Sequence, residues 1–211
     1  MKNIDLSLYL VLDPDLCARL GMVETARAAV AGGATVVQLR NKQADTARMI
    51  ETGRALKAAL FGTSARLIVN DDVEAAVAIG ADGLHIGQQD MDAPTARARI
   101  GHDMILGLSV ETEALAAAVD PAIVDYAGIG PVFATPTKAD HKQPIGFAGL
   151  ARLVRICRVP SVAIGGLKAD HVGAVFAAGA DGLAVVSAIC GTPDPEAATR
   201  DIAENIGKVH G

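Results

Sequence analysis

The chain has 211 residues, 51% of them hydrophobic, and a formal net charge of −5. This length is enough for one sizeable core, and the absence of a basic run argues against nucleic acid or an anionic membrane as a partner. With no Trp, two Tyr and four Phe, small and branched aliphatic side chains must fill the interior. Such a composition favours an α/β fold with close packing of helices on strands.

Strand-like segments come first along the chain and recur to its end. Eight short apolar runs are rich in Val, Ile and Leu, and few of them alternate with polar residues, so we expect both faces of each strand to be covered. The predicted strands are 8–12, 35–39, 66–69, 83–86, 104–108, 126–129, 161–164 and 183–186.

Most intervals between these runs have the spacing of amphipathic helices. Glycine-containing stretches such as IGADGL predict a helix end, a short turn and the next buried strand. The predicted helices are 22–30, 46–60, 73–79, 93–100, 112–119, 150–158, 170–178 and a last one that begins near Pro195. Eight such units predict a single (β/α)8 TIM barrel over residues 1–211. A doubly wound open sheet is the alternative.

The cysteines and the N-terminus bear on where the protein works. Cys17, Cys157 and Cys190 are widely spaced and form no CxxC motif, which predicts reduced, buried thiols in a cytoplasmic protein. The N-terminus runs directly into a strand-like stretch, without a signal peptide or an apolar segment of membrane length. We therefore expect no membrane partner, while a homo-oligomer stays open.

In TIM barrels the reactive groups follow the carboxyl ends of the strands. The second run ends in QLRNK, which contains Gln38, Arg40 and Lys42. The planar fork of an arginine and the mobile charge of a lysine suit a diphosphate. Alternatively, these basic side chains simply face solvent.

Carboxylates follow the third and fourth runs, at Asp71 and Asp90. Since these strands are neighbours, both side chains should lie on one rim and could hold Mg²⁺ together with a diphosphate. Alternatively, Asn70 caps the following helix and the acidic residues favour its positive end. His85 lies within the fourth run, and we interpret it as a hydrogen-bonded interior residue.

The later runs add hydroxyls and glycines. Ser109 either caps the fifth helix or donates to a ligand. Gly165 and Gly166 follow the seventh run, and Val186 and Ser187 end the eighth. Backbone N–H groups in these two loops often bind a phosphate in barrels, although glycines can also serve only the turn. Two phosphate sites in one mouth would suit a transferase that joins two small phosphorylated substrates.

The stretch GPVFATPTKADHKQPIGF, residues 130–147, is too polar and too rich in proline to be core. Together with the loops above, it carries a resemblance. The sequence resembles the thiamine-phosphate synthase family over nearly its whole length and in the family's order. The matching segments are QLRNK (38–42), VNDDVEAAVAIGADGLHIGQQD (69–90), GLSV (107–110), DYAGIGPVFATPTK (125–138), AIGG (163–166) and GLAVVSAI (182–189).

The resemblance implies a TIM-barrel transferase that requires Mg²⁺. It would condense the diphosphate of 4-amino-5-hydroxymethyl-2-methylpyrimidine with 4-methyl-5-(2-hydroxyethyl)thiazole phosphate, giving thiamine phosphate and diphosphate. Asp71 and Asp90 would hold the metal. The catalytic residues would be Arg40, Lys42, Ser109 and Lys138. The substrate-binding residues would be Gln38, Leu39, Arg40, Asn41, Lys42, Asn70, Ser109, Thr135, Pro136, Thr137, Lys138, Gly166, Val186 and Ser187.

Within this set, the lysine of the TPTK segment and Ser109 would contact the pyrimidine diphosphate, and the two threonines of TPTK the thiazole phosphate. Asn41 is a departure, because the family often has an acidic residue there. If the strand pattern continues, its side chain should point away from those of Arg40 and Lys42.

Three other functions stay open at this point. A thiazole tautomerase shares the fold but needs no pyrimidine diphosphate, so the intact QLRNK and TPTK segments argue against it. An aldolase-like barrel would need a Schiff-base lysine, and no lysine lies within the eight apolar runs. A non-catalytic sensor of thiamine intermediates would not need the full set of charged residues.

Overall fold

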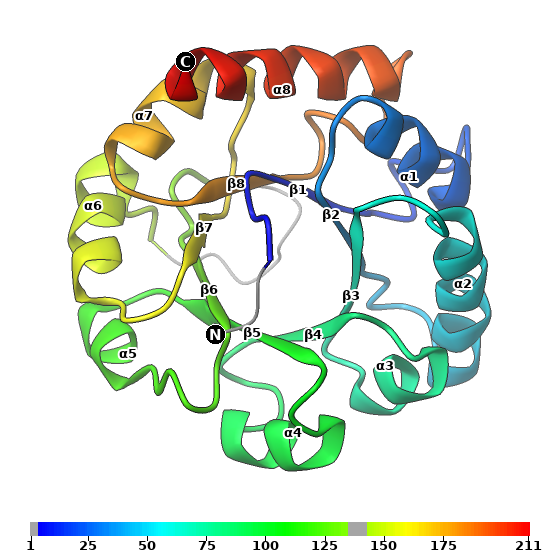
Figure 1. The fold of residues 1–211 in the computed structure, drawn as a ribbon, viewed down its shortest axis with the longest axis horizontal. Coiled ribbons are helices and arrows are strands. Elements are labelled where there is room, and N and C mark those ends of the chain that lie inside the picture. Colours follow the sequence, from blue (N-terminus) through cyan, green and yellow to red (C-terminus); the bar gives the residue numbers. More distant parts are fainter. Residues whose placement is uncertain (1–3, 135–142) are drawn as a thin grey trace.

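The computed structural model describes residues 4–134 and 143–211. Eight parallel strands pair in sequence order, and β8 pairs with β1, which closes the barrel (Figure 1). The prediction of a TIM barrel is confirmed, and the alternative of an open sheet is wrong. The strands are β1 Leu8–Val11, β2 Val36–Leu39, β3 Arg66–Asn70, β4 Gly83–Ile86, β5 Ile105–Val110, β6 Tyr126–Ile129, β7 Ser161–Ala163 and β8 Gly182–Val185.

Helices form the outer ring around this barrel (Figure 1). They are α1 Met22–Ala31, α2 Thr46–Ala59, α3 Val73–Ile79, α4 Ala93–Ile100, α5 Glu113–Ala118, α6 Gly146–Ile156, α7 Val172–Ala177 and α8 Pro195–His210, with a 3₁₀ helix, η1 Ala169–His171, before α7. The predicted start of the sixth helix at residue 150 is wrong by four residues. Gly146 and Gly149 occupy its first turn, and glycine is a poor helix former. None of the described helices has both the length and the apolar character needed to cross a membrane.

The helix caps are not the ones that the sequence suggested. The Asp72 carboxylate accepts a hydrogen bond from the Ala75 amide at the start of α3, at 2.8 Å. The Thr112 hydroxyl accepts one from the Leu115 amide at the start of α5, at 3.2 Å. The alternatives that Asn70 caps the third helix and that Ser109 caps the fifth are therefore wrong. Asn70 and Ser109 are left at the carboxyl ends of their strands, where they line a cavity.

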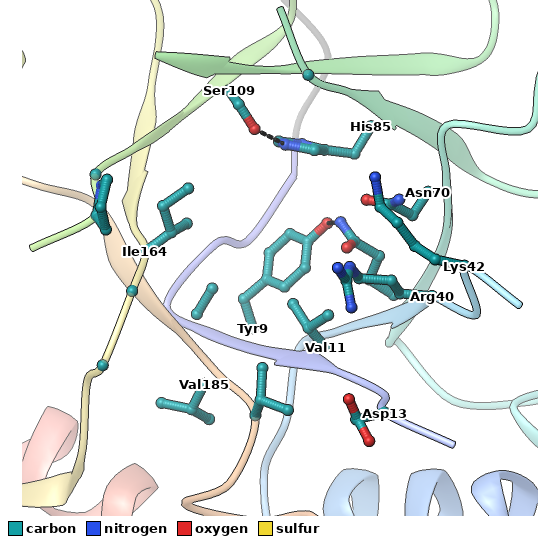
Figure 2. A pocket seen from close by; sticks show the side chains of 18 of the residues that line it. Tyr9, Val11, Asp13, Arg40, Lys42, Asn70, His85, Ser109, Ile164 and Val185 are labelled. Atoms are coloured by element: carbon teal, nitrogen blue, oxygen red, sulfur yellow. Dashed lines mark hydrogen bonds between the residues drawn. The ribbon is translucent and has the colours of Figure 1, made fainter. Parts of the chain in front are cut away.

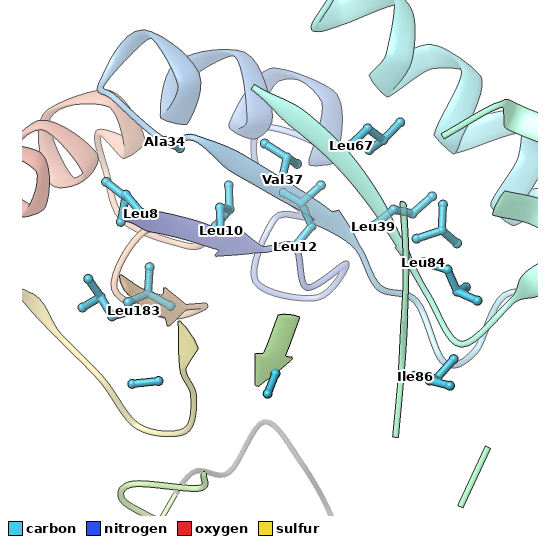
Figure 3. Close-up of a cluster of buried hydrophobic side chains, with 14 of the residues drawn as sticks. Leu8, Leu10, Leu12, Ala34, Val37, Leu39, Leu67, Leu84, Ile86 and Leu183 are labelled. Carbon is cyan, nitrogen blue, oxygen red and sulfur yellow. The ribbon is translucent and has the colours of Figure 1, made fainter. Parts of the chain in front are cut away.

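Successive side chains of each strand face the helices and the barrel interior in turn. On β1, Leu8 and Leu10 pack toward the helices (Figure 3), whereas Tyr9 faces the interior. Leu6, which precedes β1, joins the interior layer. That layer consists of Leu6, Tyr9, Val36, Ile68, Ile105, Tyr126, Val162 and Ala184. Since these side chains fill the middle of the barrel, a ligand must bind above them, at the carboxyl ends of the strands.

The three cysteines are free thiols. Cys17 and Cys190 are buried, as predicted. Cys157 is only half-buried, because it lies at the exposed C-terminal end of α6. The prediction of burial is thus wrong for this one residue.

A buried ion pair joins helix α4 to the residue that precedes strand β6. Arg97 of α4 donates to the Asp125 carboxylate at 2.6 Å, and the same carboxylate accepts the Leu106 amide at 2.8 Å. Both side chains of the pair are about nine-tenths buried. The Arg97 guanidinium also donates to the carbonyls of Gly101, Met104 and Ile123.

Replacing Arg97 with alanine is expected to lower the free energy of unfolding by about 3–5 kcal/mol, because the Asp125 charge would be left buried without its partner. Urea denaturation measures the loss. The exposed pair of Arg99 with Glu74 provides the control, since its removal by Arg99→Ala should cost about 0–1 kcal/mol. Equal small losses in the two variants would show that the buried pair adds nothing to stability.

Candidate active site

A cavity of about 790 Å³ opens at the carboxyl ends of the barrel strands (Figure 2). It is lined by residues from the ends of the strands and from the loops that follow them. With one exception, every predicted site residue within the described ranges lies on its surface. These residues are Gln38, Arg40, Asn41, Lys42, Asn70, Asp71, Asp90, Ser109, Gly166, Val186 and Ser187.

Leu39 is the exception. Its side chain is fully buried in the layer between the barrel and the helices (Figure 3), so only its backbone is left for a ligand. Thr135, Pro136, Thr137 and Lys138 lie outside the described residues, and their roles stay predictions from the sequence.

The end of β2 supplies the positive charge of the site. The side chains of Arg40 and Lys42 both reach toward the cavity (Figure 2). The strand ends at Leu39, and the Asn41 side chain accepts a hydrogen bond from the Gln43 amide at 3.1 Å. The chain therefore turns here, and Asn41 lines the cavity together with its neighbours. The expectation that its side chain points away from theirs assumed that the strand continues to residue 42, and it stays a prediction from the sequence.

The two carboxylates predicted to hold a metal come together, as expected from neighbouring strands. Asp71 lies close enough to Asp90 for the two carboxyl groups to shift each other's pKa, and Asp71 Oδ2 lies 3.0 Å from Lys42 Nζ. Asp90 Oδ2 accepts the Gly87 amide at 2.7 Å. Asp71 has φ of 63°, the only positive φ outside glycine within the described ranges. A conformation of this kind costs about 1–3 kcal/mol and is concentrated at functional sites.

The pKa values of Asp71 and Asp90 are shifted in opposite directions. Burial raises the pKa of Asp71, and the neighbouring Asp90 raises it further, against the opposing effect of Lys42. Burial also raises the pKa of Asp90, but the hydrogen bonds from Asp71 and from the Gly87 amide outweigh it, and the pKa is lowered. Two neighbouring carboxylates repel each other when both are ionised. A cation bound between them would remove that repulsion.

The donor set fits Mg²⁺. This ion takes one or two carboxylates and completes its shell with phosphate oxygens and water. Asp71 and Asp90 provide two such ligands beside Arg40 and Lys42, which suit a diphosphate. In the part of the chain that the structure describes, no three His, Cys, Asp or Glu side chains form a group that could hold a metal. Two protein carboxylates leave most of the coordination shell of Mg²⁺ to phosphate oxygens and water, so the arrangement suits a metal that is shared with a phosphorylated ligand.

The opposite side of the cavity is built from backbone. Gly165 and Gly166 after β7 have φ of 94° and 67°. A Cβ on Gly166 would lie 2.8 Å from Phe133 Cβ and 2.9 Å from the Ala134 carbonyl, so both conformation and space require glycine. After β8, the Val186 carbonyl accepts the Ile189 and Cys190 amides, which begins a helical turn. Amide groups at the start of such a turn can bind a phosphate.

A chain of hydrogen-bonded side chains lies at the floor of the cavity. The sequence analysis singled out some of its members but not the two tyrosines. His85 bonds to Ser109 Oγ (Figure 2) and to Tyr126 OH, each at 3.0 Å. Tyr126 OH bonds to Tyr9 OH at 2.8 Å, and Gln38 Nε2 donates to Tyr9 OH at 2.8 Å. The interpretation of His85 as a hydrogen-bonded interior residue is confirmed.

Tyr9 and Tyr126 were not predicted to belong to the site. The available signal was their rarity, since the sequence has only two tyrosines and each lies in a predicted strand. Gln88 was also missed. It lines the cavity and donates to the Ser109 carbonyl at 2.6 Å.

The fold and the site together define a class of protein. It is a TIM barrel whose mouth combines cationic side chains and a carboxylate pair after β2–β4 with glycine-rich turns after β7 and β8, an arrangement that suits phosphorylated ligands. The comparison with known families is more specific. The family model described as thiamine monophosphate synthase matches residues 8–189, and the chain belongs to this family.

Individual relatives agree over almost the whole chain. The thiamine-phosphate synthase of Laribacter hongkongensis is 49% identical over 202 residues, which cover 95% of each chain. That of Xanthobacter autotrophicus is 52% identical over 199 residues, covering 94% of each. Among solved structures, the thiamine phosphate pyrophosphorylase from Pyrococcus furiosus superimposes with a TM-score of 0.89 at 36% identity, covering 98% of both chains.

Proposed function

We propose that this protein is the transferase that joins the pyrimidine diphosphate and the thiazole phosphate into thiamine phosphate and releases diphosphate. The observation that carries the proposal is a single cavity with cationic side chains on one side and glycine-rich turns on the other, in a chain of the thiamine monophosphate synthase family. One side offers Arg40, Lys42 and the carboxylate pair. The other offers the backbone of the turns after β7 and β8.

In the proposed reaction the C–O bond to the diphosphate breaks first, and the leaving diphosphate takes the electron pair. The resulting pyrimidine-methyl cation is stabilised by the amino group of its ring. The thiazole nitrogen then attacks with its lone pair, which forms the new N–C bond. No protein nucleophile is required, and the protein's task is to stabilise the leaving group and to align the second substrate.

Arg40, Lys42 and Ser109 would stabilise the leaving diphosphate, with Lys138 added from the predicted loop. Bound Mg²⁺, held by Asp71 and Asp90, would supply further positive charge at the diphosphate oxygens. Gln38, Asn41 and Asn70 would fix the pyrimidine end of the same ligand. Since negative charge builds on the diphosphate as the bond breaks, donors aimed at it favour the transition state over the ground state.

The thiazole phosphate would bind across the cavity. Its phosphate would accept hydrogen bonds from backbone amides near Gly166, Val186 and Ser187, with Thr135 and Thr137 contributing from the predicted loop. The apolar side chain of Ile164 faces the cavity between the two sides (Figure 2) and suits contact with a thiazole ring.

Replacing Gly166 with alanine is expected to raise KM for the thiazole phosphate by about tenfold or more and to leave KM for the pyrimidine diphosphate nearly unchanged. The added Cβ would collide with Phe133 and Ala134 and move the turn that binds the phosphate. Steady-state kinetics with each substrate varied in turn measures the two constants. The control is Gly173→Ala in α7, where a Cβ meets no atom within 4 Å. A rise in the other KM instead would assign this turn to the pyrimidine diphosphate.

The nearest rival function is a thiazole tautomerase, which would need neither the diphosphate side of the cavity nor Mg²⁺. An aldolase-like function lacks its essential group, because none of the eight strands that the structure describes carries a lysine. The discriminating experiment measures diphosphate release by the purified protein. The proposal requires both substrates and Mg²⁺ for release. Isomerisation of the thiazole phosphate without any diphosphate release would favour the tautomerase.

The proposal includes the cytoplasm as the site of action and the two phosphorylated substrates as the partners. The three free thiols agree with a reducing compartment. A homo-oligomer stays a prediction from the sequence, and light scattering of the purified protein tests it.

A further inference from the structure

Tyr126 has no surface in the cavity, yet it is joined to the cavity floor on two sides. It is fully buried on β6, beneath the residues that line the cavity. Its hydroxyl bonds to His85 on one side and to Tyr9 on the other. Any effect of Tyr126 on a bound ligand must therefore pass through these neighbours.

The glycines around this contact indicate that space is reserved for it. A Cβ on Gly107 would overlap the ring of Tyr126 and would lie 2.5 Å from His85 Nδ1. A Cβ on Gly128 would lie 3.1 Å from His85 Cε1. Both glycines face the barrel interior, so the strands carry no side chain at the two places where His85 and Tyr126 need room.

For a neutral His85 the hydrogen bonds have two consistent directions, because each hydroxyl and the neutral imidazole carry one hydrogen each. In the first, Gln38 donates to Tyr9, Tyr9 to Tyr126 and Tyr126 to His85 Nδ1. His85 Nε2–H then donates to Ser109 Oγ, and the Ser109 O–H is available to donate into the cavity. In the second, Ser109 donates to His85 and offers only lone pairs to a ligand.

The chemistry of the ligand selects between these directions. A diphosphate is rich in acceptors and needs donors, so of these two directions the first lets Ser109 bind it. Burial raises the pKa of Tyr9 and of Tyr126 well above the usual range of tyrosine. Both hydroxyls therefore keep their hydrogens near neutral pH, and the chain can keep one direction throughout.

We propose that Tyr126 is a positioning residue for the reaction: by donating to His85 Nδ1 it keeps the imidazole hydrogen on Nε2 and thereby directs the Ser109 O–H at the pyrimidine diphosphate. This inference rests on the proposed function, because it takes the diphosphate as the ligand of Ser109. It assigns a role to a side chain that touches no substrate.

A double-mutant cycle tests the inference. Tyr126→Phe is expected to lower kcat about tenfold, with KM for the thiazole phosphate unchanged. Ser109→Ala should lower kcat at least as much. In the double variant Tyr126→Phe should cause no further loss, because the hydroxyl through which it acts is already gone. Independent effects that multiply, or an unchanged kcat in Tyr126→Phe, would overturn the inference.

The matched control removes another buried hydroxyl far from the cavity. Thr199 of α8 is fully buried and donates to the Pro195 carbonyl at 2.6 Å. Thr199→Val is expected to keep kcat unchanged even if it lowers thermal stability. A similar loss of kcat in this variant would mean that the effect of Tyr126→Phe is one of stability, and the inference would fail.

A second measurement uses the wild-type protein and does not depend on catalytic activity. In the wild-type protein with Mg²⁺ and inorganic diphosphate, the ¹⁵N chemical shifts of the His85 ring report its tautomer. The inference requires the hydrogen on Nε2, and a hydrogen on Nδ1 would overturn it. Failure of the proposed function would appear separately, as wild-type protein that forms no thiamine phosphate.

Discussion

Replacing Asp71 with asparagine is expected to lower kcat/KM for the pyrimidine diphosphate by about a hundredfold or more, which corresponds to roughly 2.7 kcal/mol. It should also raise the Mg²⁺ concentration needed for half-maximal rate. The variant keeps the shape of the residue, and asparagine tolerates the positive φ at this position. What it removes is one of the two carboxylates at the proposed metal site. Initial rates over a Mg²⁺ titration measure both effects.

The adjacent Asp72 provides the control. Its carboxylate caps α3, and asparagine is an equally good cap. Asp72→Asn should therefore keep both the rate and the Mg²⁺ dependence. If Asp71→Asn also kept its Mg²⁺ dependence, Asp71 would only shape the turn after β3, and the proposed ligand pair would be wrong.

The second large effect is expected at Arg40. Arg40→Ala should lower kcat about a hundredfold or more, the size found when one donor to a developing anion is removed. The fall in kcat should exceed the rise in KM, since charge on the diphosphate grows only as the bond breaks. Arg40→Lys should recover part of the loss, because a lysine keeps the charge but lacks the planar fork.

Rapid-quench kinetics of Arg40→Ala separates the chemical step from product release. The control is Arg48→Ala on α2, which removes an exposed partner of Glu51 and should leave kcat unchanged. A large rise in KM with a normal kcat in Arg40→Ala would instead assign Arg40 to ground-state binding.

The fold could be predicted because the signals that specify it are local. Each barrel strand is a short apolar run, and the strand ends differ from prediction by two residues at most. The first turn of α6 was not predicted because it contains Gly146 and Gly149, and glycine has a low helix propensity. The stability of this turn comes from packing rather than from propensity. Asn70 stayed open as an alternative cap because three polar residues in a row, Asn70 to Asp72, can each cap a helix. Only the backbone geometry selects Asp72.

The charged side of the site could also be predicted, because parallel strands place their carboxyl ends at one edge. Asp71 and Asp90 are far apart in sequence but meet because β3 and β4 are neighbours. The tyrosine pair could not be found this way. Tyr9 and Tyr126 come from β1 and β6, which are not paired strands, and they meet only across the interior of a closed barrel. The prediction for Leu39 is restricted to its backbone, because its side chain faces the helices rather than the cavity.

The most direct test of the central claim follows product formation by the purified protein. The protein is incubated with the pyrimidine diphosphate, the thiazole phosphate and Mg²⁺, and both products are separated by chromatography. We predict thiamine phosphate and diphosphate in equal amounts, no product after EDTA, and recovery when Mg²⁺ is restored. A protein that binds the thiazole phosphate but forms no thiamine phosphate under these conditions would contradict the claim that one cavity joins the two substrates.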